Sequence, residues 1–456
     1  MTASPPGTAG PAPPAGATGT TPTWGIEPGG PLRGEVRISG AKNLVTKLMV
    51  ASLLADAPST ILNAPQLGDV DITASMLRSL GADVRVEAVA AGDGATIVVA
   101  PESVGEGRIP VSYTGLNRVP ILLVGPLLHR VGEAFVPLVG GDRIGNRPVD
   151  FHVSALRQFG AEVHLTPDGL EAKALRLEGA HIRLEFPSVG ATESVLLTAA
   201  TARGRTTLEN AAIEPEVVEL ALFLQRMGAR IEMQPDRVFV IEGVPRLGPA
   251  RQRLGGDRIE AFSYLVAGLA TGGRVRIRGC SQDRLVTAIS TLQRMGAHFE
   301  ISEDGIAAEG GDLHPAAVQT NTHPGFMTDW QPPLVVLFTQ VPGMSVVHET
   351  VFEDRLGYVE ALRAMGAEIE LFQQCLVGQA CRFQQSDWQH SALVRGVCPM
   401  AGAEMVMPDV RGAFAYVIAA AAATGRSTLH GVHHLARGYD HPLEKFSELG
   451  LRITPQ

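Results

Sequence analysis

Apolar and polar positions follow one pattern that recurs six times along the chain. Each copy reads apolar, polar, polar (alanine in the fifth copy), apolar, glycine, and then alternates as a half-buried strand does. The copies occupy residues 77–84, 156–163, 224–231, 292–299, 362–369 and, in degraded form, 446–453. We predict that an amphipathic helix ends at each glycine, because a helix often closes with a left-handed residue and glycine adopts that conformation without steric cost.

A second pattern lies between these copies. Short strands are predicted at 204–210, 273–279 and 425–431, each after an alanine-rich helix (195–202, 261–270 and 413–423). The unit therefore alternates helices and strands over about 70–80 residues, longer than a solenoid repeat. Six copies without evident capping repeats favour a closed or pseudo-symmetric α/β architecture.

Some of the predicted helices have no polar face. The segments 48–54 and 416–423 are apolar all round, which is typical of buried helices. We therefore expect domains with helices inside and sheets outside.

Length and charge limit the classes of function. The 456 residues suggest two or more domains, and a net charge of −9 argues against a general nucleic-acid binder. An anionic ligand must then be held by a local cluster of arginine and lysine. No apolar run is long enough to span a bilayer. Residues 1–23 are rich in proline and glycine and indicate a disordered extension with no signal peptide, so we expect a cytoplasmic protein.

The four cysteines, Cys280, Cys375, Cys381 and Cys398, show no CxxC spacing and no nearby histidine pattern. Buried free thiols are the expectation, with a disulfide as the alternative. The adjacent His433 and His434 are interpreted as structural. We expect no metal and no organic cofactor.

Residues 138–150 form the most unusual polar segment, with three glycines, two arginines and two aspartates. It lies between a predicted strand (134–139) and a helix from about Pro148. Such a loop can fold over a small charged molecule and bring Asp142 or Arg147 against it. The alternative is an ordinary surface loop.

The chain resembles the enolpyruvyl transferase family from Gly34 to Ile453. Within that family it resembles the branch that acts on UDP-N-acetylglucosamine, since the serine-rich lysine motif and the Asn-Ala-Gly-Thr segment of the shikimate-pathway branch are absent. The motifs that carry the resemblance are 40–43, 140–150, 188–192, 210–212, 257–260, 328–329, 351–355, 409–411 and 437–439.

The resemblance implies an α/β (α+β) fold of two inside-out barrel lobes, each built from three repeats, with the active site between them. The first lobe is expected at 42–254, and the second at 24–41 plus 255–456. The implied reaction adds a sugar hydroxyl to C2 of phosphoenolpyruvate, protonates C3, and then eliminates phosphate. It needs cations for two anionic groups, an acid and a base.

The resemblance also assigns roles to residues. Lys42 contacts phosphoenolpyruvate, Asp142 protonates C3 and Asp329 removes the hydroxyl proton, with Asp409 and Arg437 completing the catalytic set. The substrate-binding residues implied are Asn43, Arg118, Arg147, Pro148, Val149, Asp150, Ser188, Val189, Gly190, Val351, Arg355 and Arg411. Among these, 148–150 are expected at the uracil and 188–190 at the diphosphate.

Each role has a structural alternative. Lys42 opens an apolar helix, where a cation opposes the helix dipole, so a bound anion is suspected. Arg118 could be a flanking residue whose stem lies on apolar surface. Asp329 and Asp409 could be helix N-caps, and Asp409 could do both jobs.

Asp142 stands where many family members carry the cysteine that the epoxide fosfomycin alkylates. A carboxylate is a poorer nucleophile toward epoxides than a thiolate, so we expect fosfomycin resistance. As an acid, Asp142 would have to be desolvated by closure of its loop.

Gly68, Pro187 and Ile213 stand where well-known members carry cations, Ala436 replaces an aspartate, and Met327 replaces a proline. These departures leave open another uridine nucleotide, such as UMP, as acceptor. A further alternative is a non-catalytic paralogue that binds a UDP-sugar. The protein is expected to be a monomer or a weak homo-oligomer.

Overall fold

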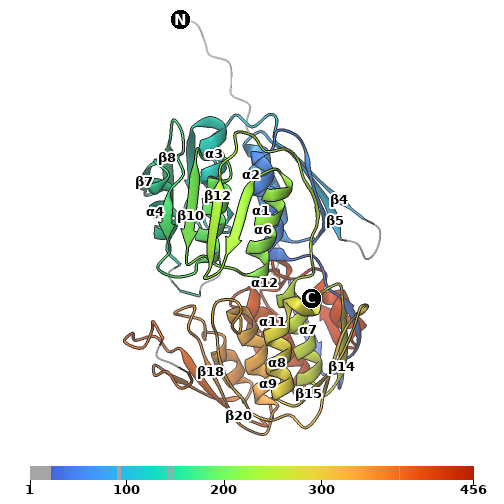
Figure 1. Cartoon of the computed structure of the whole chain (residues 1–456). Coiled ribbons are helices and arrows are strands. Elements are labelled where there is room, and N and C mark those ends of the chain that lie inside the picture. The colour runs from blue at the N-terminus through green and yellow to red at the C-terminus, as the bar shows by residue number, and fades with distance from the viewer. Residues whose placement is uncertain (1–21, 90–93, 142–143, 146, 379–380) are drawn as a thin grey trace, which may run out of the picture.

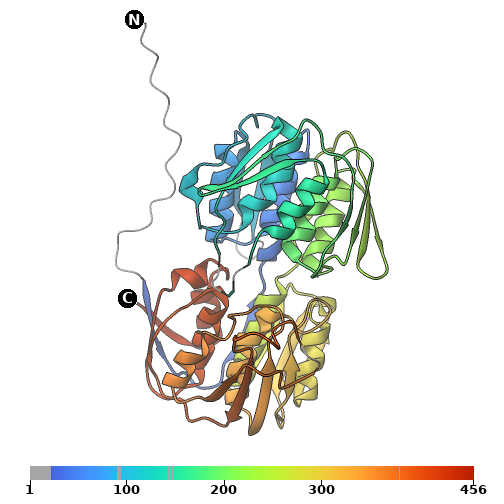
Figure 2. The same ribbon diagram turned by 90° about the vertical axis from the view of Figure 1, so that its left-hand side faces the viewer.

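The computed structural model describes residues 22–89, 94–141, 144–145, 147–378 and 381–456. Its strands form five sheets of four strands and one of three, counted over these residues, and the sheets surround two groups of helices in two stacked lobes (Figure 1). The helices of each lobe lie inside and the sheets outside, as Figure 2 also shows. The predicted inside-out α/β arrangement is confirmed.

The first lobe carries the sheets β13-β3-β5-β4, β6-β8-β7 and β11-β12-β10-β9. Its strands are β3 (Ser59–Ala64), β4 (Asp83–Ala88), β5 (Ala95–Ala100), β6 (Glu133–Pro137), β7 (Glu162–Thr166), β8 (Gly169–Lys173), β9 (His181–Arg183), β10 (Arg205–Glu209), β11 (Arg230–Gln234), β12 (Val238–Glu242) and β13 (Arg251–Arg253). Its helices are α1 (Lys42–Ala51), α2 (Gly68–Ser79), α3 (Val124–Val131), α4 (Asp150–Gln158), α5 (Val189–Ala199) and α6 (Pro215–Arg226), with 3-10 turns at Ser52–Leu54, Val111–Tyr113 and Val119–Leu123.

The second lobe carries the sheets β15-β16-β14-β2, β17-β18-β20-β19 and β21-β22-β1-β23. Its strands are β1 (Thr23–Glu27), β2 (Arg33–Arg37), β14 (Arg274–Arg278), β15 (Ala297–Ser302), β16 (Gly305–Gly310), β17 (Ala317–Gln319), β18 (Gly343–His348), β19 (Glu368–Phe372), β20 (Ser391–Gly396), β21 (Glu404–Val406), β22 (Ser427–His430) and β23 (Arg452–Pro455). Its helices are α7 (Arg258–Ala270), α8 (Val286–Arg294), α9 (Gln331–Thr339), α10 (Val359–Ala364), α11 (Val410–Ala422), α12 (His433–Ala436) and α13 (Pro442–Glu448), with 3-10 turns at Gln282–Arg284 and Thr328–Trp330.

Six glycines show why the repeat forms as it does. Each of the repeated glycines follows a helix with a positive φ, between +91° and +108°. A residue with a Cβ would be strained there, so glycine ends the helix and releases the chain into the next strand. The six residues are Gly81, Gly160, Gly228, Gly296, Gly366 and Gly450.

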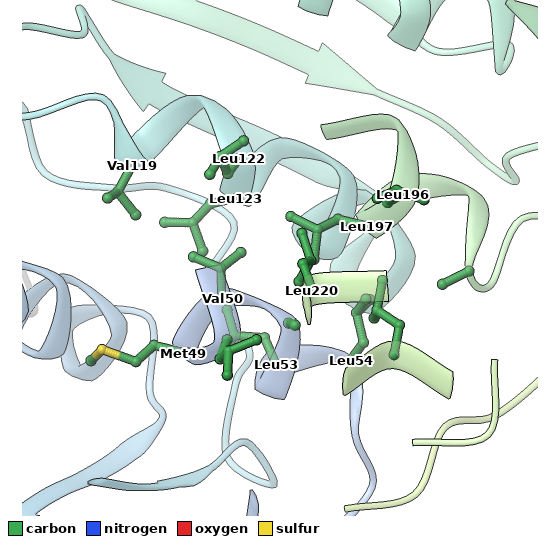
Figure 3. Close-up of a cluster of buried hydrophobic side chains, with 14 of the residues drawn as sticks. Met49, Val50, Leu53, Leu54, Val119, Leu122, Leu123, Leu196, Leu197 and Leu220 are labelled. Atoms are coloured by element: carbon green, nitrogen blue, oxygen red, sulfur yellow. The ribbon is translucent and has the colours of Figure 1, made fainter. Parts of the chain in front are cut away.

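The apolar helices form the two cores. Every residue of α7 and α9 is buried. In the first lobe, Met49, Val50 and Leu53 lie in the same cluster as Leu123 and the leucines of α5 and α6 (Figure 3). Burial of such side chains contributes about 25 cal/mol per Å² of apolar surface, which makes these clusters the main source of stability.

The N-terminal strands belong to the second lobe. Strand β1 pairs with β22 and β23, and β2 pairs in parallel with β14. One core uses residues between 41 and 254, and the other uses 24–38 and 261–451. The lobe boundaries stay a prediction that these cores support. The predicted extension 1–23 falls outside the described residues except at its end, where Thr23 already belongs to β1.

The strand before the segment 138–150 ends two residues earlier than predicted, and the helix after it begins two residues later. Strand β6 ends at Pro137, and α4 begins at Asp150, because the backbone of Val149 is not yet helical (φ −108°, ψ 13°). Among the helices of the described residues, none has both the length and the apolar character that a bilayer-crossing segment requires.

Candidate active site

The chain crosses between the lobes twice, side by side, and these crossings place Lys42. Gly40 forms a β-bridge with Gly256, and the amide of Asp257 donates to the carbonyl of Ser39 (2.9 Å). The Asp257 carboxylate caps α7 through the amides of Ile259 and Glu260, and its other oxygen accepts from the amide of Lys42 (2.9 Å). One aspartate thus fixes the starts of α1 and α7, and Lys42 lies at the lobe junction.

Asp69 links Lys42 to Arg437 across the lobes. Its Oδ2 lies 2.9 Å from Lys42 Nζ, and its Oδ1 lies 3.2 Å from Arg437 Nη2. Arg437 also donates to the carbonyl of Leu116 (3.0 Å). Burial would raise the pKa of Asp69, but Lys42 and Arg437 outweigh it and the pKa is lowered. The sequence prediction missed Asp69, because an acidic residue in the first turn of α2 is ordinary at a helix start.

Asp329 lies between two arginines of the second lobe. Its Oδ1 lies 2.7 Å from Arg355 Nη2, and its Oδ2 lies 3.4 Å from Arg411 Nε. Burial would raise its pKa, but Arg411, Arg355 and, more weakly, Lys42 and Arg147 lower it below its usual range. The two last-named cations belong to the first lobe, so Asp329 lies in one electrostatic site built from both lobes.

The N-cap alternatives have different outcomes for the two aspartates. Asp329 lies inside the 3-10 turn before α9, and the N-cap position of α9 is Trp330, without a side-chain cap, so this alternative is wrong. Asp409 does cap α11, accepting from the amides of Arg411 (2.8 Å) and Gly412 (3.1 Å). It also lies 4.0 Å from Arg355 Nη1, which connects the cap to the arginine cluster.

The glycine-rich segment contacts the second lobe. A Cβ on Gly140 would collide with the carbonyl of Gly115, so only glycine fits at this crossing. The buried Ile144 accepts a hydrogen bond from the amide of Asp354 (3.3 Å), and the guanidinium of Arg147 lies 5.6 Å from the ring centre of Phe352. The described residues of this segment are therefore not an ordinary surface loop. Asp142, the predicted acid, lies outside the described residues.

Arg118 and Arg147 are held near each other. Burial and the positive charge of Arg147 together lower the pKa of Arg118 to about 10. Arg118 Nη2 also donates to the carbonyl of Pro148 (3.4 Å). Two partly buried cations that disfavour each other are typical of a site prepared for an anion.

The residues expected at the nucleotide lie beside this arginine pair. Pro148, Val149 and Asp150 line a surface depression of about 740 Å³ at the start of α4. Ser188 caps α5 through the amide of Ala191 (3.4 Å), and Val189 and Gly190 form its first turn, where amides face outward. A Cβ on Gly190 would lie 3.3 Å from the ring of His152 in α4, so the two helix starts are adjacent.

Asn43 and Val351 complete the predicted set. Asn43 is the second residue of α1, next to Lys42, and is partly exposed. The amide of Val351 donates to the carboxylate of Glu349 (2.7 Å), and its carbonyl accepts from Arg382.

Two of the four cysteines differ from the expectation. Cys280 and Cys398 are buried, as predicted, but Cys375 and Cys381 are only partly buried. The sequence pattern suggested no histidine near them, yet His390 Nε2 lies 3.5 Å from Cys375 Sγ. Sequence spacing missed this contact, because it is formed by side chains at the ends of separate strands.

Two stacked inside-out lobes bring a lysine, arginines and aspartates together at their junction, an arrangement typical of a transferase that binds anionic substrates. The family model of EPSP synthase (3-phosphoshikimate 1-carboxyvinyltransferase) matches residues 26–446, and the chain belongs to this family.

Curated relatives give a finer comparison. The chain is 42% identical to the UDP-N-acetylglucosamine 1-carboxyvinyltransferase of Protochlamydia amoebophila, over 94% of this chain and 93% of the relative. It is 39% identical to the enzyme of that name from Nitratidesulfovibrio vulgaris, over 94% of this chain and 98% of the relative.

Solved structures agree on the fold. The enolpyruvyl transferase NikO from Streptomyces tendae superposes with a TM-score of 0.83 at 27% identity, covering 96% of this chain and 99% of NikO. An EPSP synthase from Acinetobacter baumannii superposes at 0.67 with 18% identity, covering 96% and 100%, and shows the fold alone.

Proposed function

We propose that the protein transfers the enolpyruvyl group of phosphoenolpyruvate to the 3-hydroxyl of UDP-N-acetylglucosamine, with release of phosphate, in peptidoglycan precursor synthesis. The observation that carries the proposal is the environment of Asp329. This candidate base is paired with Arg355 and Arg411 and is influenced by Lys42 and Arg147 of the other lobe. The relatives that are about 40% identical along nearly the whole chain support the acceptor.

The chemistry is an addition followed by an elimination. Asp329 takes the proton of the sugar hydroxyl while the hydroxyl oxygen bonds to C2 of phosphoenolpyruvate. Asp142 gives a proton to C3. The resulting tetrahedral adduct then loses a C3 proton and expels phosphate, which restores the double bond. Lys42, Arg437 and the arginine pair Arg118–Arg147 neutralise the phosphate and carboxylate, where preorganised cations act most strongly.

The acceptor would lie along the starts of α4 and α5. Pro148, Val149 and Asp150 would contact the uracil, and the amides of 188–190 would face the diphosphate, as helix N-termini favour anions. Asn43 and Val351 would contact the sugar side. Asp409, as cap of α11 and neighbour of Arg355, would keep the arginine cluster in position.

UMP is the second candidate acceptor. Gly68, Pro187 and Ile213 replace cations that well-known family members carry, and a nucleotide without the second phosphate needs fewer of them. A non-catalytic UDP-sugar binder is less well supported, because simple binding needs neither the base Asp329 nor its arginine partners. The oligomeric state stays a prediction of a monomer or weak homo-oligomer.

Phosphate release with each nucleotide tests the proposal. We expect kcat/KM for UDP-N-acetylglucosamine to exceed that for UMP by tenfold or more, which corresponds to about 1.4 kcal/mol. Asp329→Ala should abolish release and keep nucleotide binding, whereas Asp304→Ala, in the exposed β15–β16 turn, should change neither. Phosphate release with UMP but not with UDP-N-acetylglucosamine would show that UMP is the acceptor. Nucleotide binding without phosphate release would indicate the non-catalytic alternative.

A further inference from the structure

Four metal-ligand side chains converge at one end of the sheet β17-β18-β20-β19. His348 ends β18, Cys375 follows β19, and Cys381 and His390 lie in the connection that leads into β20. The pairing explains the convergence, because Ser391, the first residue of β20, lies opposite both His348 and Phe372. One ligand atom from each of the four side chains lies within 4.8 Å of the other three.

The two contacts of Cys375 have the lengths expected around a shared tetrahedral ion. Cys375 Sγ lies 3.6 Å from Cys381 Sγ and 3.5 Å from His390 Nε2. Zinc bonds of about 2.3 Å to sulfur and about 2.0–2.1 Å to nitrogen place two sulfurs about 3.8 Å apart and sulfur and nitrogen about 3.6 Å apart. A disulfide would need sulfurs about 2.05 Å apart, so the present arrangement is that of two thiols.

Both imidazoles are oriented for ligation. His348 Nδ1 lies 2.6 Å from the carbonyl of Val377, and His390 Nδ1 lies 2.9 Å from the carbonyl of Trp388. A carbonyl oxygen only accepts, so each Nδ1 carries the proton and each Nε2 presents a lone pair to the cluster. This hydrogen bond from the second ring nitrogen is the usual support of a metal-bound histidine.

His348 supplies an independent indication of a ligand. The residue is fully buried, and its Nε2 has no hydrogen-bond partner among the described residues. A buried polar atom without a partner destabilises the fold, and a metal bond would remove that cost. The amide of Phe383 donates to Cys381 Sγ (3.3 Å), which stabilises a thiolate there.

We propose that His348, Cys375, Cys381 and His390 bind one zinc ion in a closed, structural site. Two thiolates and two imidazoles are the ligand set that zinc prefers, and four protein ligands leave no position for water or substrate. Binding releases two protons, one from each thiol, and changes no oxidation state. The transfer reaction proposed above does not depend on this ion.

The ion would fasten an unusually long hairpin connection. Residues 373–390 join the adjacent strands β19 and β20, and their described part forms only turns and bends. Connections beyond about 12–15 residues without secondary structure are uncommon in compact domains. This one carries Arg382, which donates to the carbonyl of Val351 and lies over the ring of Phe186 in the first lobe (4.5 Å). Zinc would therefore hold an arginine at the lobe junction.

Metal analysis of the full-length protein tests the site. We expect about one zinc per chain by mass spectrometry of the metal content, and retention after dialysis against a weak chelator. Cys375→Ser and His390→Ala should each lose the zinc. Cys280→Ala, which removes a buried cysteine elsewhere in the lobe, should retain it. A strong chelator should lower the Tm of the wild type and of Cys280→Ala only.

A second measurement needs no variant. Cobalt added to metal-free wild type should give the intense absorption of a tetrahedral ion together with thiolate-to-cobalt charge transfer. The proposal would be overturned by a weak octahedral spectrum, or by thiols of Cys375 and Cys381 that react freely in the presence of stoichiometric zinc. Rapid Cys375–Cys381 disulfide formation without zinc affinity would instead make the cluster a redox pair, which also refutes it.

Discussion

Arg437 of the second lobe donates from Nε and Nη2 to Oδ1 of Asp69 in the first lobe, at 3.3 and 3.2 Å. The other carboxylate oxygen holds Lys42 Nζ at 2.9 Å. Asp69 thus keeps two like charges together before an anion arrives. Loss of one partner from a buried charge pair typically costs about 2–5 kcal/mol, more than the gain from one less negative charge near the substrate.

We therefore predict that Asp69→Asn lowers kcat/KM for phosphoenolpyruvate by tenfold or more. Asp71→Asn, two residues along α2 and exposed, provides the matched control and should change it less than twofold. Steady-state phosphate release at varied phosphoenolpyruvate checks both. Equal kinetics for the two variants would mean that Asp69 does not orient the cations.

The two arginines at Asp329 set the pH range in which it can act as a base. Its lowered pKa keeps the carboxylate ionised below its usual range, against the effect of burial. Arg355→Gln removes one partner and so raises this pKa. As pH falls, kcat/KM should then begin to drop at a higher pH than in the wild type, because less positive charge opposes protonation of the carboxylate.

A pH profile of phosphate release measures the shift. Arg363→Gln, an equal change of charge on the exposed side of α10, should leave the acid limb where it is. An unmoved acid limb in Arg355→Gln, at measurable activity, would assign that limb to another group.

Fosfomycin tests the residue at position 142. We predict that the wild type gains no mass when treated with the epoxide, whereas Asp142→Cys is alkylated and inactivated, because a thiolate attacks epoxides far better than a carboxylate. Ser154→Cys, an exposed thiol on α4, should not react at a comparable rate, because it lies outside the proposed phosphoenolpyruvate site, where Arg118 and Arg147 would hold the anion. Intact-protein mass spectrometry measures the adduct on the wild type and on both variants. An adduct on wild-type Asp142 would refute resistance.

The sequence predicted the features that local rules determine. The six repeated glycines, the first at Gly81 and the last at Gly450, correctly predicted where helices end, because a positive φ favours glycine. Apolar segments such as 416–423 correctly predicted the buried helices. Through the family resemblance, the sequence also indicated Lys42, Asp329 and Arg411, which the fold brings to one junction.

Contacts between distant segments were not predictable in the same way. Asp69 and Arg437 are far apart in the chain, and Asp69 alone looks like an ordinary helix-start acid. Asp257 was named only as part of the motif 257–260, and the structure shows that it caps α7 and also anchors the start of α1. The histidines beside Cys375 come from other strand ends, so their approach depends on sheet pairing, which no short motif encodes.

Glu193 carries a stability prediction. This residue of α5 is buried, its Oε1 lies 4.0 Å from Lys47 Nζ, and that oxygen has no hydrogen-bond partner among the described residues. Burial raises its pKa from 4.5 to about 7, with Lys47 opposing the shift. Between these values the folded state binds more protons than the unfolded state, so this group makes the protein less stable as pH rises through that window.

Glu193→Gln removes the titration and keeps the shape. The difference in unfolding free energy, Glu193→Gln minus wild type, should increase from pH 5 to pH 8. The increase should be on the order of 1–3 kcal/mol, since each pKa unit corresponds to about 1.4 kcal/mol. Thermal unfolding at both pH values should therefore show the variant gaining a few degrees over the wild type at pH 8 only. Glu171→Gln, an exposed change on β8, should show the same Tm difference at both pH values. A pH-independent difference for Glu193→Gln would mean that its carboxyl ionises in the folded protein as it does in the unfolded chain.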